Sequence, residues 1–114
     1  MIDIILKNHL EGVLDVPVVM EIPKNPAAEY VLIERTGTRM IQKRVEEATL
    51  AIQTYSTTLY KAALLQYLVR DAMNAAEELP EIGSVEVTGM YNYSDDATKQ
   101  YRYQGVYSVI NYSV

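Results

Sequence analysis

The spacing of hydrophobic and polar residues changes along the chain, and each period predicts a different element. Apolar residues recur every three to four positions in two stretches, which puts them on one face of an α-helix. The first stretch covers residues 3–12 and begins at Asp3, a favoured N-cap residue. The second begins at a cap on Thr57 or Thr58 and continues to about Leu79. The sequence therefore predicts one short amphipathic helix and one long helix.

Five other stretches are rich in β-branched residues or alternate with a period of two, which is typical of β-strands. They are residues 16–23, 30–35, 45–56, 85–93 and 101–112. Pro17 and Pro23 frame the first of them, and proline cannot donate a hydrogen bond to a neighbouring strand. We therefore expect this short strand at the edge of a sheet.

The order of these elements, α-β-β-β-α-β-β, predicts the fold class. Strands outnumber helices and the connections resemble hairpins. We expect an α+β protein with a mostly antiparallel sheet of about four or five strands, one long helix packed on a face, and a short N-terminal helix. A length of 114 residues is that of one ordinary domain, and no linker or repeat divides the chain. Residues 1–114 are therefore expected to form a single domain.

The long helix has a wider apolar face than one sheet requires. Tyr60, Leu64 and Tyr67 form a flank beside the main apolar stripe. We predict that another surface covers this flank.

All ten aromatic residues are tyrosines, which indicates surfaces that are only partly shielded from solvent. Each buried hydroxyl requires a hydrogen-bond partner, whereas protein interfaces are enriched in tyrosine. On the last strand, one face carries Tyr101, Tyr103, Tyr107 and Val109, and the other carries Arg102, Gln104, Val106, Ile110 and Tyr112. Neither face has the composition of plain solvent-exposed surface. We predict that the sheet face opposite the long helix meets protein; an amphipathic surface or extra core contacts are the alternative.

The segment RTGTRMIQKR, residues 35–44, is basic in a chain whose net charge is −5. We expect a loop here, and two interpretations remain open. It is either a solvated hairpin tip or a mobile docking loop in which Arg39, Lys43 and Arg44 contact an acidic surface. The acidic balance of the whole chain argues against specific nucleic-acid binding, which depends on phosphate neutralisation by lysine and arginine.

The residues needed for catalysis, cofactor binding or metal binding do not form recognisable sets. The chain has no cysteine, one histidine, His9, and five glycines that never cluster into a phosphate-binding loop. Three pairs of adjacent carboxylates occur. We expect Glu46 and Glu47 to point to opposite faces of a strand, and the pairs 77–78 and 95–96 to face water; an oxygen-ligand cation site at the turn 95–98 stays an alternative. We therefore expect no enzyme activity, no cofactor and no metal. The chain also lacks a secretory leader and a membrane-spanning apolar run, so we expect it in the cytoplasm.

Several of these stretches carry a family resemblance. The segment DDATKQYRYQGVYSVINY, preceded by a strand that ends in MYNYS, resembles the C-terminal signature of small proteins from tailed phages and prophages of Gram-positive bacteria. EYVLIERTG with the charged loop after it, and ATLAIQTYSTTLYKAALL leading into the long helix, agree with that resemblance, which covers roughly residues 29–112. The similar proteins are tail terminators and related head-tail joining proteins.

The resemblance implies a non-enzymatic assembly protein that forms a ring, expected to be hexameric. The ring would cap the tail tube protein and offer a surface to head connector proteins, with DNA only in passage. Its expected location is the cytoplasm of the bacterial host during assembly and then the head-tail junction of the virion. The matched segment implies fold-defining or intersubunit roles for Tyr101, Arg102, Tyr103 and Gln104.

Three alternatives stay open at this stage. One is a head-completion or connector protein of the same junction. Another is a small α+β adaptor outside phages that binds a partner through its tyrosine-rich sheet. The third is a small enzyme or ligand-binding domain, which would need a concave pocket with convergent polar groups.

Overall fold

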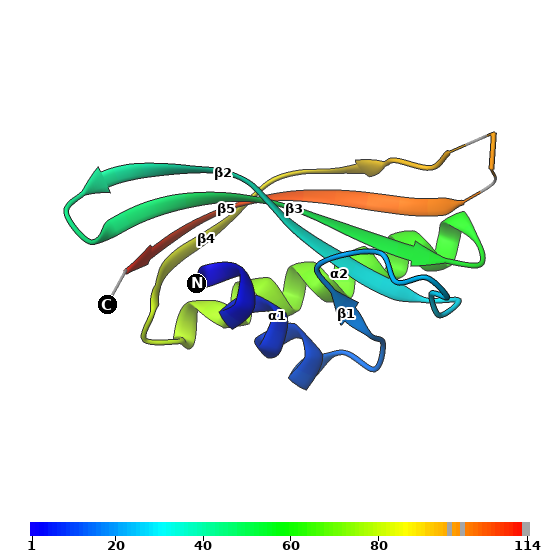
Figure 1. Ribbon diagram of the computed structural model, residues 1–114, viewed down its shortest axis with the longest axis horizontal. Helices are drawn as coiled ribbons and strands as arrows, with labels where there is room; N and C mark the ends of the chain where they lie inside the picture. The colour runs from blue at the N-terminus through cyan, green and yellow to red at the C-terminus, as the bar shows by residue number, and fades with distance from the viewer. Residues whose placement is uncertain (96, 99, 113–114) are drawn as a thin grey trace.

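Two helices lie against one face of a five-stranded sheet (Figure 1). The computed structural model describes residues 1–95, 97–98 and 100–112. Its elements are α1 (Ile2–Val13), β1 (Val18–Val19), β2 (Tyr30–Gln42), β3 (Val45–Ser56), α2 (Leu59–Ala75), the 3₁₀ turn η1 (Ala76–Glu78), β4 (Ile82–Asn92) and β5 (Tyr101–Tyr112). The α+β class and the element order predicted from the sequence are confirmed.

The strands are ordered β1-β2-β3-β5-β4 across the sheet. The β2–β3, β3–β5 and β4–β5 pairs are antiparallel, and only the short β1 pairs parallel, with Val31 and Leu32 of β2. β1 therefore lies at the edge, as its framing prolines predict. α2 connects β3 to β4, which lie on either side of β5.

Two hairpins lie at opposite ends of the sheet, and the β2–β3 hairpin extends beyond the helices (Figure 1). One is the β2–β3 hairpin, whose turn is Lys43–Arg44, and the other joins β4 to β5. The prediction of a loop over residues 35–44 is wrong, because most of this segment pairs with β3 as an extension of β2. β3 is itself held by β5 as far as the Val45–Tyr112 pair, which supplies a fixed partner for this charged and polar stretch. Two register shifts, Arg35/Gly37 and Met40/Gln42, interrupt the β2–β3 pairing.

The main core lies between the helices and the sheet. Alternate residues of β3, Ala48, Leu50 and Ile52, are fully buried there, as the period-two pattern predicts. α1 contributes Ile2, Leu6 and Leu10, and α2 contributes a stripe that includes Val69 and Met73. A second, smaller cluster of Tyr30, Leu32 and Tyr55 lies apart from the main core, with Val19 packed against it.

Of the two N-caps predicted from the sequence, one is present in the structure and one is not. Thr58 caps α2, because its side chain accepts a hydrogen bond from the backbone N–H of Lys61 at 3.1 Å. Asp3 does not cap α1, which begins one residue earlier, so that Asp3 is buried in the first turn instead. His9 ties the two helices together through a 2.8 Å hydrogen bond between its Nε2 and the carbonyl oxygen of Ala72.

Candidate functional site

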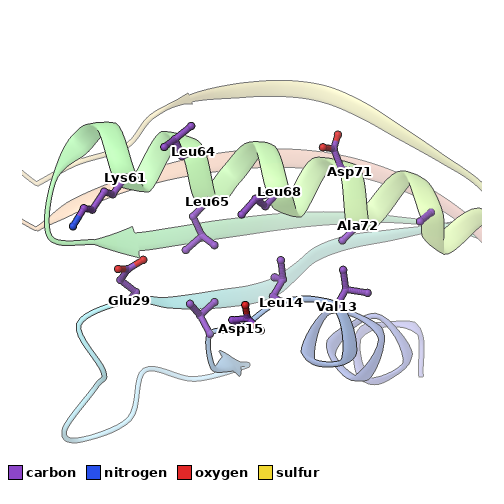
Figure 2. A pocket seen from close by; sticks show the side chains of 12 residues that line it. Val13, Leu14, Asp15, Glu29, Lys61, Leu64, Leu65, Leu68, Asp71 and Ala72 are labelled. Atoms are coloured by element: carbon purple, nitrogen blue, oxygen red, sulfur yellow. The ribbon is translucent and has the colours of Figure 1, made fainter.

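A groove of about 570 Å³ separates α2 from the end of α1 and the segment that follows it (Figure 2). Its apolar lining comes from Val13, Leu14, Val16, Leu64, Leu65, Leu68, Ala72 and Ala75. Figure 2 shows Leu65 pointing down from α2 into this space and Leu14 on its opposite side, below the helix. The two walls come from segments about fifty residues apart, and the His9–Ala72 hydrogen bond fixes one helix against the other.

The groove leaves large apolar side chains open to solvent. Leu68 is 56% exposed, Val13 is 55% exposed and Leu64 is 48% exposed. Contiguous exposed apolar surface on a globular chain marks an interaction site more often than scattered single residues do. The apolar flank predicted on the long helix is therefore left uncovered by the rest of the described chain.

The charged residues along the groove are mostly acidic. Asp15, Glu29 and Asp71 line it together with one lysine, Lys61. Asp71 forms an ion pair with Arg70 at 3.0 Å, whereas Asp15 and Glu29 have no ion pair among the described residues. Two carboxylates, Asp15 and Glu29, therefore stand against the single cation Lys61, and the groove presents apolar walls with a small excess of negative charge beside them.

The tip of the β2–β3 hairpin is also apolar, but the charge beside it is positive. Met40 and Ile41 are exposed apolar residues there, and Lys43 and Arg44 form the turn beside them. Neither cation of the turn has an ion pair within the part of the chain that the structure describes, whereas Arg39 pairs with Glu47 on β3 at 3.2 Å. The three basic residues predicted for a docking loop thus lie on a structured hairpin and not on a mobile loop.

A row of polar side chains crosses the sheet face opposite the helices. The Tyr55 hydroxyl donates to Gln53 Oε1 at 2.8 Å, and Gln53 Nε2 donates to Gln104 Oε1 at 2.8 Å. Gln104 Nε2 in turn donates to the Tyr91 hydroxyl, so the row connects three neighbouring strands. Tyr30 stacks on Tyr55 with ring centroids 4.4 Å apart.

Arg102 anchors one end of this row. Its Nη1 donates to the Tyr55 hydroxyl at 3.1 Å, and its Nε donates to the carbonyl oxygen of Tyr93. The guanidinium also lies 4.8 Å from the centre of the Tyr93 ring, within the range of cation–π contacts. Burial, followed by the neighbouring Tyr55, raises the pKa of Tyr30 above its ordinary value of 10.0. Because Gln53 and Gln104 are almost fully buried although no helix covers this face, the row stiffens the sheet from its open side.

The tyrosines predicted at an interface differ widely in their exposure to solvent. Tyr60 and Tyr67 are exposed on α2, and Arg70 lies 4.8 Å above the Tyr67 ring. Tyr101 is partly exposed at the start of β5, and Tyr103 is half-buried. Tyr107 is fully buried in the main core, where it offers no surface to a neighbour. Its prediction as an interface residue is therefore corrected.

The described residues contain no group of three or more histidine or acidic side chains placed to hold a metal ion. Of the carboxylates at the predicted cation site, Asp96 lies outside the described residues. Asp95 accepts a hydrogen bond from the backbone N–H of Ala97 at 3.0 Å. A hydrogen bond from the Thr98 hydroxyl, followed by that from Ala97, lowers the pKa of this exposed carboxyl below its ordinary value.

Among the described residues, no helix has both the length and the apolar character needed to cross a membrane. Neither a comparison with protein-family models nor a search of curated proteins finds a match for this chain.

Sequence reasoning missed the groove itself and the apolar residues at the hairpin tip. Leu68 and Val69 are adjacent apolar residues of α2 that cannot both face the sheet, and only Val69 is buried. This adjacency is a signal in the sequence for an exposed leucine. Met40 and Ile41 lie between basic residues, and two adjacent apolar residues show no period of their own. No sequence pattern predicts the row of polar side chains, because the row depends on the β3–β5 register that places Gln53 opposite Gln104.

Proposed function

We propose that this chain is a structural assembly subunit that forms a ring at the head-tail junction of a tailed phage or prophage, as a tail terminator does. In this role it caps the tail tube and has no enzymatic activity. Its own copies, the tail tube protein and the head connector are its partners.

The observation that carries the proposal is the open apolar groove beside α2. A chain that works alone gains nothing from leaving Val13, Leu64 and Leu68 in water, whereas an assembly subunit buries such residues against a neighbour. The hairpin that projects beyond the helices gives the subunit a second contact surface at a distance from the first (Figure 1).

The phage context comes from the sequence resemblance over roughly residues 29–112. The net charge of −5 is compatible with a conduit for DNA, because like charge opposes binding to phosphate. The DNA is then a passenger and not a ligand.

Two experiments test the proposal. One measures the native mass of the purified chain, and the other examines the particles made by a phage in which the gene is deleted. Light scattering over a concentration series and electron micrographs should show ring particles, alone or on the ends of tail tubes. Deletion of the gene should give tubes of uncontrolled length that are not joined to heads. Tails of normal length in the deletion strain, with heads that fail to join them, would replace the terminator by a head-completion or connector protein. Normal virions would refute the assembly role.

A further inference from the structure

We propose that the tip of the β2–β3 hairpin of one copy inserts into the α1–α2 groove of the next copy. The partner of the groove is therefore a second copy of this chain, bound head to tail. This inference rests on the proposed assembly function, and it names the contact that would join neighbouring subunits.

The two surfaces are complementary in polarity. The tip presents Met40 and Ile41, which are 58% and 43% exposed, and the groove presents leucine and valine side chains with room between its walls. At about 570 Å³ the groove lies within the roughly 300–1,000 Å³ range of pockets that enclose a ligand. Docking would remove both apolar surfaces from water at once, which is the main favourable term in association.

The two surfaces are also complementary in charge. Lys43 and Arg44 lie on the turn next to the apolar tip residues, and neither has an ion pair among the described residues. Asp15 and Glu29 line the groove, and neither has an ion pair among the described residues. Together they outweigh Lys61, the one cation in the groove lining. Opposite charges around an apolar centre fix the register of an interface and repel wrong partners.

The tip cannot reach the groove of its own chain. β3 is paired with β5 as far as Val45, so the hairpin is held in the sheet up to its turn, and its tip lies away from the helices (Figure 1). Tip and groove are different surfaces, and such a contact is heterologous, so each copy keeps one free tip and one free groove until the assembly closes into a ring.

A cross-linking experiment tests the contact directly, because the chain contains no cysteine. Ile41→Cys and Leu68→Cys are made as two separate proteins, mixed in equal amounts and oxidised over a concentration series. We expect a disulfide-linked heterodimer, since each protein carries one thiol and the bond can only join two copies. Mixtures of Ile41→Cys with Tyr60→Cys and of Leu68→Cys with Tyr93→Cys are matched controls, because these exposed tyrosines lie outside the groove and at the opposite hairpin.

The outcomes separate this inference from the proposed function. Cross-linking of the Ile41–Leu68 pair alone supports the docking. Ring particles in micrographs without that cross-link, or equal cross-linking of the controls, would overturn the docking and leave the assembly role standing. Absence of the cross-link together with normal virions from the deletion strain would overturn both.

A charge exchange gives a second test with its own rescue. Lys43→Glu with Arg44→Glu should weaken self-association by about tenfold or more, and so should Asp15→Lys with Glu29→Lys in a separate protein. Mixing the two proteins should restore pairing, because the reversed tip then meets the reversed groove. Failure of the mixture to associate, with both proteins folded by circular dichroism, would count against the contact.

Discussion

The Tyr107 hydroxyl donates a 2.7 Å hydrogen bond to Gln66 Oε1 inside the main core. Both side chains are fully buried. Gln66 Nε2 also donates to the carbonyl oxygen of Ile52 at 2.9 Å, so one glutamine of α2 is bonded to two adjacent strands. A polar pair in an apolar layer is satisfied in only one arrangement, and it therefore fixes the position of α2 over the sheet.

Tyr107→Phe should lower the free energy of unfolding by about 1–3 kcal/mol, because it leaves the buried Gln66 oxygen without its donor. Urea denaturation monitored by circular dichroism measures this change. Tyr67→Phe is the matched control, since Tyr67 is exposed on the same helix that carries Gln66 and should change stability little. Equal effects of the two variants would remove the special role of the Tyr107–Gln66 pair.

The free energy of unfolding should fall at alkaline pH because Tyr107 is buried in its protonated form. Burial raises the pKa of Tyr107 well above its ordinary value of 10.0. Below about pH 10 the hydroxyl is protonated in both states and contributes no pH dependence; above it, the unfolded chain releases the proton that the folded chain retains. The free energy of unfolding should therefore decrease by up to about 1.4 kcal/mol per pH unit for this group. Tyr107→Phe should show a shallower decrease in urea denaturation between pH 9 and 11, and identical slopes would contradict the assignment.

Gly105 provides the space that the Tyr107–Gln66 pair occupies. A Cβ added at Gly105 would lie 2.5 Å from Gln66 Oε1 and 2.7 Å from Cε1 of Tyr107. Gly105→Ala should destabilise the fold by about 1–3 kcal/mol, because these buried groups have no room to move apart. Gly12→Ala is the matched control: Gly12 lies exposed in α1 with nothing within 4 Å of an added Cβ, so alanine there should stabilise by about 0.5–1 kcal/mol. Thermal unfolding of both variants checks that the first change lowers the stability of the fold and the second raises it.

Substitution of Arg44 should have opposite effects on the stability of the chain and on its self-association. Its φ of 69° lies in the left-handed region, which costs a residue with a side chain about 1 kcal/mol and glycine little. Arg44→Gly should therefore stabilise the isolated chain against urea, while light scattering shows weaker association because one cation of the tip is gone. Lys43→Ala should weaken association without the gain in stability. A variant Arg44→Gly that associates as well as the original chain would remove Arg44 from the contact.

The order of elements could be predicted because periodicity is a local property of the sequence. The alternation over Ala48, Leu50 and Ile52 and the proline frame around β1 each indicate an element without reference to the rest of the chain. The outer half of β2 could not be predicted in this way. Its residues have the composition of a loop, and they form a strand because β3 lies beside them, fixed in place by β5.

The candidate site depended still more on long-range packing. The walls of the groove, Leu14 and Leu65 among them, meet only when α1 packs on α2. The composition of β5 predicts Tyr107 at an interface because a buried hydroxyl needs a partner. That partner, Gln66, lies 41 residues away, and no sequence pattern connects the two. The exposed flank of α2 was predictable, since its excess of apolar residues is visible along a single helix.

The outer edge of β2 carries features that oppose the pairing of this strand with another chain. β1 pairs only with Val31 and Leu32, so most of β2 has no strand on that side among the described residues. Two register shifts bend this edge, and Glu34, Arg35 and Arg39 place charges along it, which are the features that oppose strand-to-strand aggregation. A subunit that grows head to tail through its hairpin and also adds strands along an open edge would spread in two dimensions. Protection of the β2 edge disfavours strand addition on that side of the sheet, as the proposed head-to-tail ring would require.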